Sequence, residues 1–393
     1  MKEIQTKINI IGGGLIGVAA AYSLSKLGNS VVILEKNAKF DQKKILDKRT
    51  TAISEGTKKY LEKINIWKEI RNYAEPIKKI QIIDRNQSNK IYFDNQRRSS
   101  NLGYIIRNEF MLKSFYKKLQ KQKNVKIFNN VSIDDVFYKG NRIITKQKDF
   151  SVNSNLLLAS DGKNSFIRKI FKTPIYIKDY KKKAIVINFY HSKNHHNTAY
   201  EFFFKNGPLA ILPMQNNKNE FQSSIVWTNT SEFINSIISL DDNKIIDILN
   251  SKIKGSIGKI NKIITKQTFP LRAHLNSKFY EERTVYIGDS AHSFHPIAGQ
   301  GWNLGMQDLE SLYNLVKKYN SLGLELGDDV FCKEFQKNNF FKAYRLYQIT
   351  DKVDSIFKLD NSIFNHARFV IINLIERSKK LKNQISDFAM GVN

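Results

Sequence analysis

Cysteine is almost absent from this chain of 393 residues, where Cys332 is the single example. One thiol cannot form an intrachain disulfide, and it cannot supply the thiolates of a cysteine-based zinc site. The composition therefore fits a reducing compartment. Hydrophobic residues make up 41% and charged residues 25%, which argues against general disorder. The length predicts two or three packed domains.

Long apolar runs are also missing, since no stretch approaches the ~20 apolar residues that a membrane-spanning helix needs. The longest late run, Phe369–Ile375, is too short. Near the N-terminus an apolar run is interrupted by Gly12, Gly13, Gly14 and Gly17, and no small-residue cleavage site follows it, so it does not resemble a signal peptide. We expect a cytoplasmic protein, and peripheral attachment to the inner face of a membrane stays open.

Acidic residues are scarce relative to basic ones, 36 against 64, which leaves a net charge of +28. Strong positive charge can indicate binding to nucleic acid or to anionic membranes. Lysine is scattered through the whole chain with abundant asparagine and isoleucine, however, and AT-rich codon usage produces the same pattern. No helix-turn-helix, zinc-finger or RRM signature is present, so we expect no nucleic-acid partner. Compositional bias is the favoured interpretation, and attraction to anionic lipid is the alternative.

The sequence opens with a predicted strand, helix and second strand, at residues 6–11, 15–27 and Val31–Leu34. The turn between the first strand and the helix has the pattern G-x-G-x-x-G, which brings backbone N–H groups to a pyrophosphate at the positive end of the helix. Glu35, at the end of the second strand, can accept hydrogen bonds from ribose hydroxyls. These features predict a dinucleotide site, NAD or FAD, whose turn residues are Gly12, Gly14, Leu15, Ile16 and Gly17.

Two later strands each end in a carboxylate and a glycine. The strand beginning at Leu156 leads into Asp161-Gly162, with Ser165 and Arg168 on the helix that we expect next. The strand Val285–Ile287 leads into Gly288-Asp289. Either carboxylate alone could simply cap the following helix. Their occurrence together, after the glycine turn, favours a shared cofactor site.

These motifs together resemble the single-component flavoprotein aromatic hydroxylases, which are similar to para-hydroxybenzoate hydroxylase. The resemblance implies tightly bound FAD, with Gly288 and Asp289 at its ribityl chain. Asp161 and Arg168 match a motif that lies near the pyrophosphate and is implicated in both FAD and pyridine-nucleotide use. In the same family an arginine reaches the FAD phosphates or ribose, and Arg49 matches it.

Two of these assignments leave alternatives open. Arg49 could instead be a solvated loop arginine beside Lys48. Arg107 and Asn108 both fall where relatives place a residue against the FAD, and Arg107 is our choice for the site.

The most specific motif is the string from His295 to Asp308, HPIAGQGWNLGMQD, a proline-stiffened, glycine-rich loop that leads into an amphipathic helix over about 303–318. Such a loop can present N–H groups to a flat ring, and the helix N-terminus adds partial positive charge. The string resembles the signature of the ubiquinone-biosynthesis hydroxylases. The resemblance implies that the following residues face the flavin: Pro296, Gly299, Gln300, Gly301, Asn303 and Leu304.

Further landmarks of that subgroup occur in the expected order along nearly the whole chain. They are Asp47–Arg49, Gly103–Ile105, Gly207–Pro213, Ser224–Trp227 and Phe269–Leu271. Ser290 replaces a commoner alanine, which is a small departure. His292 and His295 are spaced i, i+3, but on a loop and without further ligands, so we expect no metal site.

The resemblance also implies a reaction. NADPH or NADH reduces FAD, reduced FAD and dioxygen give a flavin hydroperoxide, and its distal oxygen hydroxylates a polyprenylated phenol or benzoquinol on the route to ubiquinone. A ferredoxin donor stays open, and no residue stands out as a general acid or base. Other ubiquinone-biosynthesis proteins and a membrane surface are conceivable partners. The alternatives are a related enzyme for soluble aromatic substrates and a non-catalytic flavin-binding scaffold.

We expect an α/β protein with a Rossmann-like FAD-binding domain, an inserted strand-rich substrate domain and a helical C-terminal region. The expected FAD-binding domain comprises residues 1–75, 101–175 and 266–330. The β-sheet substrate domain would comprise 76–100 and 176–265, and the helical region 331–393. Seven apolar residues in the substrate domain suit a greasy ligand or a sheet core equally well: Phe202, Phe203, Phe204, Leu209, Ile211, Met214 and Trp227.

Overall fold

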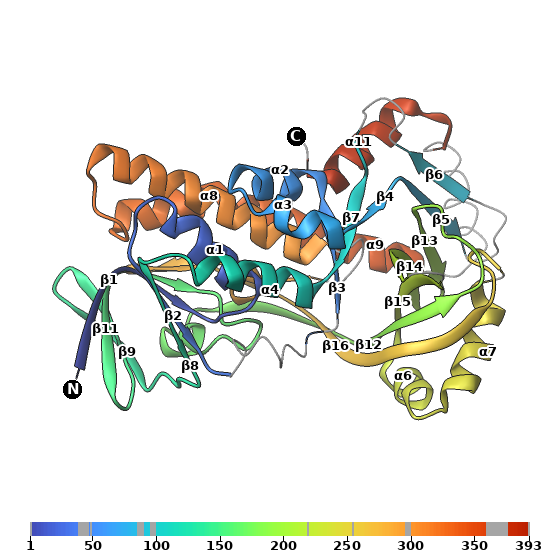
Figure 1. Ribbon diagram of the computed structural model, residues 1–393, viewed down its shortest axis with the longest axis horizontal. Helices are drawn as coiled ribbons and strands as arrows, with labels where there is room; N and C mark the ends of the chain where they lie inside the picture. Colours follow the sequence, from blue (N-terminus) through green and yellow to red (C-terminus); the bar gives the residue numbers. More distant parts are fainter. Residues whose placement is uncertain are drawn as a thin grey trace.

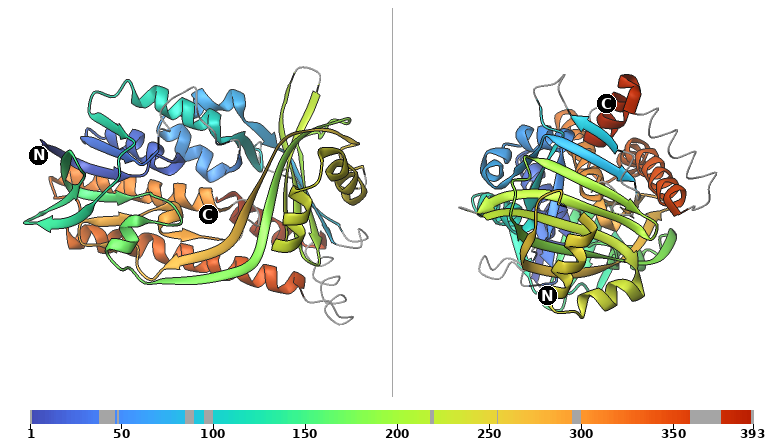
Figure 2. Two further views of the ribbon diagram at one scale, coloured as in Figure 1. Left: turned by 90° about the horizontal axis from the view of Figure 1, so that it is seen from below. Right: turned by 90° about the vertical axis from the view of Figure 1, so that its right-hand side faces the viewer.

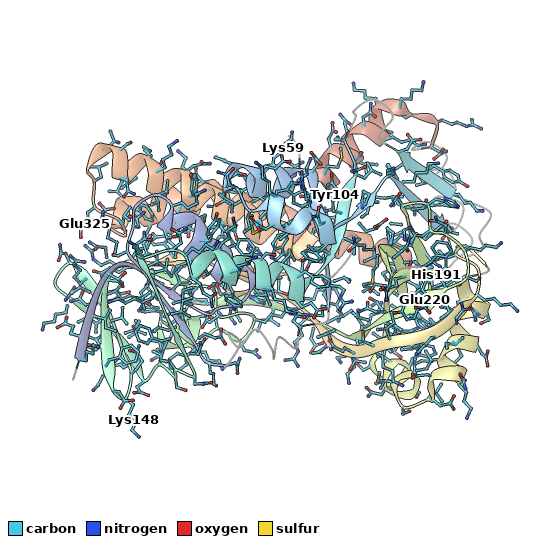
Figure 3. All side chains as sticks on the ribbon, in the orientation of Figure 1. Lys59, Tyr104, Lys148, His191, Glu220 and Glu325 are labelled. Atoms are coloured by element: carbon cyan, nitrogen blue, oxygen red, sulfur yellow. The ribbon has the colours of Figure 1, made fainter. Side chains whose placement is uncertain are left out.

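The computed structural model describes residues 2–37, 47, 49–84, 90–94, 100–217, 220–253, 255–294, 300–358 and 376–391. Within these ranges the strands form two eight-stranded sheets and one three-stranded sheet. Figure 1 shows the first large sheet and its helices at one end of the molecule, the second large sheet at the other, and two long strands running between them. Lys148 and His191, at opposite ends in Figure 3, mark the two sheets.

The first large sheet has a parallel centre, in which β1 (Lys2–Ile11) lies between β2 (Val31–Glu35) and β11 (Phe150–Ala159). The predicted strands at 6–11 and 31–34 are therefore confirmed. Because parallel strands end at the same edge, the glycine turn, Glu35 and the residues after β11 and β18 meet there. The remaining strands are β8 (Val125–Asn129), β9 (Asp135–Lys139), β10 (Arg142–Lys146), β17 (Tyr280–Glu281) and β18 (Thr284–Tyr286).

Helices α1 (Leu15–Ser25), α4 (Asn108–Leu119) and α8 (Gln300–Leu322) pack together against this sheet (Figure 1). Helices α1 and α8 confirm helices expected from the sequence, and α1 is buried from Gly17 to Ser25 because it lies between the sheet and the two other helices. Beside them lies the small sheet of β3 (Thr50–Ser54), β7 (Gly103–Arg107) and β4 (Glu75–Ile77). The short helices of this region are α2 (Glu55–Lys63), α3 (Trp67–Ile70), η1 (Arg71–Tyr73), α5 (Phe166–Ile170) and η2 (Gly288–Ser290).

The second large sheet is antiparallel except where β13 and β5 run parallel. One face carries a core of isoleucine, leucine and aromatic side chains beneath α6 (Ser231–Ile238) and α7 (Asp242–Ile253). Its strands are β5 (Lys79–Asp84), β6 (Lys90–Asp94), β12 (Ile175–His191), β13 (Thr198–Phe204), β14 (Gly207–Asn217), β15 (Glu220–Thr230), β16 (Ile260–Asn276) and β19 (His292–Ser293).

Two features of this sheet went beyond the sequence prediction. The sequence indicated a strand-rich region over 176–265 and no helix within it, yet α6 and α7 follow β15. Their buried residues Ile234, Ile237, Ile245 and Leu249 have helical spacing that the prediction missed. In addition, the long strand β16 extends across the proposed boundary at 265 and reaches the first domain (Figure 2). The domain boundaries stay a prediction.

The C-terminal region contains α9 (Asp329–Lys358) and α11 (Lys379–Met390), as the sequence predicted for the residues that the structure describes. The buried stripe of α9 includes Phe331, Phe335 and Ala343. Phe364 and the apolar run Phe369–Ile375 lie outside the described residues. None of the helices described is long and apolar enough to cross a membrane.

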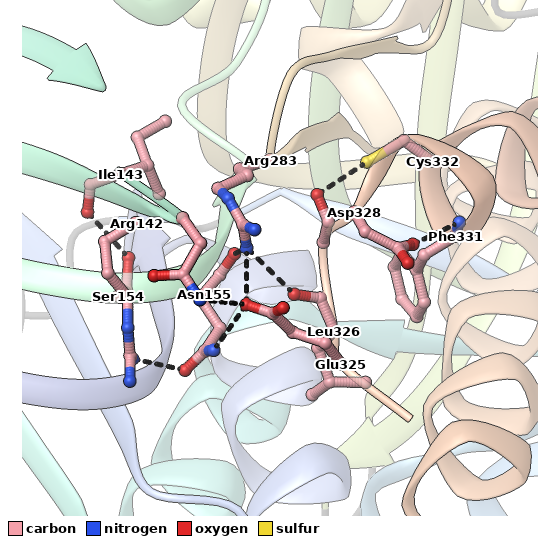
Figure 4. A network of polar contacts seen from close by, with 12 residues as sticks. Arg142, Ile143, Ser154, Asn155, Arg283, Glu325, Leu326, Asp328, Phe331 and Cys332 are labelled. Atoms are coloured by element: carbon pink, nitrogen blue, oxygen red, sulfur yellow. Dashed lines mark hydrogen bonds and ion pairs between the residues drawn. The ribbon is translucent and has the colours of Figure 1, made fainter. Parts of the chain in front are cut away.

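A polar network joins strand β11 to the residues just before β18 and α9 (Figure 4). Arg283 donates hydrogen bonds to the carbonyl of Asn155 at 3.3 Å and to Glu325 at 3.1 Å, which ties β11 to the turn before α9. Nearby Cys332 is fully buried, and this burial raises the pKa of its thiol to about 12. The thiol therefore stays protonated and has no reactive character.

Candidate active site

The glycine turn between β1 and α1 is compact on one side and open on the other. A Cβ on Gly17 would lie 1.9 Å from the carbonyl oxygen of Gly12, and a Cβ on Gly12 would lie 2.5 Å from that of Ser160. By contrast, a Cβ on Gly14 would meet no described atom within 4 Å. No side chain of the described residues caps α1 at Gly14, so the N–H groups in the first turn, those of Leu15 and Ile16, are left for another acceptor. The turn can therefore receive an anionic group.

Glu35 lies beside this turn, as the sequence predicted. Its buried carboxylate accepts hydrogen bonds from the backbone N–H groups of Gly13 at 2.6 Å and Asn37 at 2.9 Å. The hydroxyl of Tyr116, on α4, donates to the carbonyl of Gly13 at 2.7 Å. The turn is thus held from both sides, and Tyr116 is a contributor that the sequence analysis missed.

Arg49 has an exposed side chain that belongs to a polar cluster, so both interpretations from the sequence, a solvated loop residue and a cofactor contact, stay predictions. Its guanidinium donates to Asp47 from Nε at 2.7 Å and from a terminal nitrogen at 2.6 Å. The hydrogen bond with Asp47 raises the pKa of Arg49, and the negative charge of Asp289 adds to this effect. Burial alone would raise the pKa of Asp47, but the hydrogen bonds from Arg49 outweigh it and the pKa is lowered. Lys48 lies outside the described residues.

The structure distinguishes Arg107, the residue chosen from the sequence, from Asn108, the alternative that was left open. Asn108 joins the Arg49 cluster, because its side-chain amide donates to Asp47 at 3.0 Å and accepts from Thr51 at 2.6 Å. Arg107 pairs with Glu109 and lies 5.0 Å from the ring centroid of Phe110. Asn108 is therefore the residue that shares contacts with Arg49.

The Gly288-Asp289 motif touches both the glycine turn and α8. A Cβ on Gly288, where φ is +58°, would lie 3.2 Å from the side chain of Ile16, and a Cβ on Gly305 would lie 3.0 Å from the Cα of Gly288. The side chain of Asp289 is exposed, on the side from which its charge reaches Arg49. Ile16, Gly288 and Gly305 therefore bring three separate sequence motifs into one place.

At the Asp161-Gly162 motif the structure shows helix capping. Asp161 accepts hydrogen bonds from the N–H groups of Phe166 at 2.7 Å and Ile167 at 3.2 Å, and Ser165 accepts one from Arg168 at 3.1 Å. Burial raises the pKa of Asp161. The capping alternative that the sequence left open is thus realised, and a role toward a cofactor stays a prediction.

The guanidinium of Arg168 lies in the interior and joins α5 to the loop of the Gly288-Asp289 motif. It donates to the carbonyl of Ser290 at 3.0 Å and to Nε2 of His274 at 3.3 Å. Burial, together with the positive charge of Arg168, lowers the pKa of His274 to about 3, so this imidazole is neutral. Burial also lowers the pKa of Arg168.

The helix that follows the predicted flavin-facing loop is anchored by Asn303. Its side chain accepts a hydrogen bond from the N–H of Ser54 and donates one to the carbonyl of Ala52, both at 2.9 Å. Leu304 is buried, and a Cβ on Gly301 would meet no described atom within 4 Å. Pro296 and Gly299 lie outside the described residues, and Gln300 begins α8.

Comparison with known proteins agrees with this geometry. A family model described as "FAD binding domain" matches residues 5–321. The chain belongs to this FAD-binding family. It is 26% identical to the ubiquinone hydroxylase UbiL of Rhodospirillum rubrum, covering 97% of this chain and 89% of that one. It is 25% identical to the mitochondrial ubiquinone biosynthesis monooxygenase COQ6 of Dictyostelium discoideum, covering 98% and 91%.

Among solved structures, the p-nitrophenol 4-monooxygenase PnpA of Pseudomonas putida superimposes with a TM-score of 0.80 at 16% identity, covering 100% of this chain and 99% of that one. The expected fold class is confirmed, with its Rossmann-like FAD-binding part and its strand-rich part. FAD is the cofactor of this family, and the protein is an FAD-dependent monooxygenase. The residues present fit this cofactor, because the N-terminus of α1 is uncapped and there is open space at Gly14 and Gly301.

The sequence analysis missed a buried pair directly beneath the site. Nε2 of His292 donates to the carboxylate of Asp308 at 2.6 Å, and the same carboxylate oxygen accepts from the N–H of Gly288 at 3.1 Å. Both side chains are buried. A signal was available, since Asp308 lies four residues from both Leu304 and Leu312, on the apolar face of α8. A carboxylate on such a face needs a partner.

The second sheet carries polar side chains, most of them buried, on the face opposite α6 and α7. The hydroxyl of Thr50, on β3, lies 3.4 Å from that of Ser224, and Asn188 donates to Thr265 at 3.0 Å.

The opposite face answers the question left open for the seven apolar residues of the substrate domain. Four of them belong to the sheet core under α6 and α7: Phe202, Leu209, Ile211 and Trp227. Phe204 packs against that core, and Met214 lies in a separate cluster.

Proposed function

We propose that this protein hydroxylates the aromatic ring of a polyprenylated phenol or benzoquinol intermediate of ubiquinone biosynthesis, with dioxygen as oxidant and NADH or NADPH as reductant. The contact of Ile16, Gly288 and Gly305 carries the proposal, because it joins the three motifs of a flavin site. The likeness to ubiquinone hydroxylases over nearly the whole chain supports the choice of substrate class.

On this proposal the edge of the parallel sheet holds FAD. The N–H groups of Leu15 and Ile16 bind its pyrophosphate, and Glu35 accepts from its adenosine ribose. Asp289, exposed and close to Arg49, binds the ribityl chain. Arg49 keeps its positive charge because of Asp47, so it can bind a phosphate or ribose oxygen.

When bound and reduced, FAD supplies the activation of dioxygen that ring hydroxylation requires. The protein supplies position and charge. The N-terminus of α8 presents N–H groups and partial positive charge at Gly301. Thr50, which is partly exposed and is positioned by the buried hydroxyl of Ser224, orients the phenol. No residue is assigned as a general acid or base.

The test is a spectroscopic turnover experiment with the purified full chain. We expect a flavin spectrum that is bleached by NADH or NADPH without oxygen and returns, with hydroxylated product, when oxygen and a prenylated phenol are added. Ser224→Ala should lower kcat/KM for the phenol and leave the flavin spectrum unchanged. Colourless protein that FAD cannot reconstitute would overturn the proposal. If small soluble phenols were hydroxylated and prenylated phenols were not, the proposed substrate class would be wrong and soluble aromatic compounds would take its place.

A further inference from the structure

The outward face of α9 between residues 337 and 352 combines positive charge with exposed aromatic rings. Phe341 is 74% exposed, the highest value among the large hydrophobic side chains that the structure describes, and Tyr344 is 44% exposed. The opposite face of α9 is buried against the first domain, so the rings are not needed to pack the helix. The basic–aromatic face, as we call it, consists of Lys337, Phe341, Lys342, Tyr344, Arg345 and Lys352.

Charge on this face is of one sign. Among the exposed positions from 337 to 352, all of which the structure describes, none is acidic. Asp351 is partly buried and pairs with Lys178 of β12. Because the chain is basic almost everywhere, lysines alone would not distinguish this helix. The exposed aromatic rings distinguish α9 from α4, which also exposes two lysines, Lys113 and Lys117, but has no exposed large hydrophobic side chain among its described residues.

The basic–aromatic face also borders a groove that leads to the flavin end of α8. The groove has a volume of about 790 Å³ and lies between α8 and α9. Lys342, Arg345 and Leu346 line it on one side. Leu304 and Gln307, from the N-terminal part of α8, line the other. A molecule held at this face therefore lies beside a groove that reaches the N-terminal part of α8.

We propose that the basic–aromatic face of α9 docks on an anionic lipid bilayer. Aromatic rings favour the boundary between head groups and acyl chains, and lysines beside them pair with anionic head groups. A bilayer is also where a polyprenylated phenol would reside, so the reason for docking rests on the proposed function, whereas the docking itself does not require turnover.

The test measures co-sedimentation of the FAD-loaded full chain with vesicles. One set is an equal mixture of phosphatidylcholine and phosphatidylglycerol, and the other is phosphatidylcholine alone. We expect binding to the mixed vesicles only, weakened by added salt. Neutralising a lysine near the surface should lower affinity about five-fold, so Lys337→Glu with Lys342→Glu should lower it by about 25-fold or more. Phe341→Ser should lower it by about ten-fold.

The matched control is Lys113→Glu with Lys117→Glu on α4, which makes the same change in net charge. This control should bind the mixed vesicles nearly as well as the unchanged protein. An equal loss in the control, or no loss with Phe341→Ser, would overturn the proposal, because diffuse charge would then explain binding. No vesicle binding, with a concentration-dependent dimer that Phe341→Ser abolishes, would overturn it in favour of a second copy of the chain.

Flavin content and turnover of detergent-dispersed prenylated phenol separate this proposal from the proposed function. Normal turnover without vesicle binding overturns the docking surface alone. Vesicle binding that depends on Phe341 and Lys342, without any turnover, leaves the surface standing and removes the proposed function.

Discussion

The parallel sheet presents its functional groups at an edge, whereas the antiparallel sheet presents them on a face. At the edge, the glycine turn, Glu35 and Asp289 follow directly on strand ends, and backbone N–H groups do much of the binding. On the face, Ser224 and Trp227 belong to one strand, yet Ser224 lies beside Thr50 and Trp227 lies in the core under α6. Alternation along a strand separates these two roles.

This difference indicates in which sheet a substitution can change stability without changing function. At the edge the same backbone makes the fold and the cofactor site, so one substitution should affect both. On the face of the second sheet the two roles belong to different side chains, so substitutions should affect one at a time. Four predictions test this contrast, in order of decreasing effect.

The largest effect is expected for Gly17→Ala. The added Cβ would lie 1.9 Å from the carbonyl oxygen of Gly12, so the turn or α1 must move. We expect loss of bound FAD and a fall of more than about 4 kcal/mol in the free energy of unfolding, because the clash is with backbone rather than with a movable side chain. Flavin absorbance and denaturant unfolding measure both. Gly14→Ala is the control, because its Cβ enters open space; it should fold normally and bind FAD more weakly. A Gly17→Ala protein with normal FAD content would contradict the contrast.

Trp227→Ala should lower the free energy of unfolding by about 4 kcal/mol, since its fully buried ring packs against Phe233. FAD bound to the folded protein should be retained, because the cavity lies in the other sheet. Denaturant unfolding and flavin content are the measurements. On the same strand, Ser224→Ala should change stability by less than about 1 kcal/mol. Loss of FAD in folded Trp227→Ala would show that the two sheets are not separable.

Asp308→Asn should cost about 3 kcal/mol of unfolding free energy, because His292 loses the carboxylate that accepts its buried N–H. FAD affinity should fall as well, since the same oxygen holds the N–H of Gly288. Thermal unfolding with and without added FAD separates the two effects. Asp242→Asn, on the surface helix α7, is the control and should change neither. If Asp308→Asn lowered stability alone, the pair would be structural only.

The smallest effect concerns pH. The pKa of His274 is lowered from 6.5 to about 3, so between these values the unfolded chain binds a proton that the folded chain does not. Stability is therefore complete above about pH 6.5 and falls as the pH decreases, by roughly 2 kcal/mol at pH 5. His274→Asn should flatten this slope in denaturant unfolding. Burial also lowers the pKa of His191 and His195, so a residual slope should persist in the variant. An unchanged slope would contradict the assignment to His274.

Much of the edge could be predicted from the sequence, because its elements are local. The strand, glycine turn and helix of residues 2–25 follow from apolar runs and from glycines that tolerate close backbone contacts. The cofactor followed from three motifs, and the family confirms it. Less local features escaped prediction: Tyr116 reaches the turn from α4, 103 residues later in the chain than Gly13.

For the apolar residues of the second sheet, the sequence could not decide whether each side chain lies in the core or in a ligand site. Phe202 and Trp227 are apolar residues of strands in either case, and their side of the sheet depends on how β12 to β15 pair and on where α6 packs. Likewise, Arg107 and Asn108 are neighbours in sequence, and the position of Asp47 decides which of them shares a contact with Arg49.

By itself, then, the sequence determined the parallel strands, the glycine turn and the amphipathic start of α8, since each depends on residues close together in the chain. The choice of FAD came from the resemblance to a known family. Only the tertiary structure decided that His292 and Asp308 form a buried pair beneath Gly288, that Arg168 faces inward to Ser290, and that α9 leaves Phe341 exposed. These are contacts between segments far apart in sequence, and their partners depend on how whole elements pack rather than on any local pattern of residues.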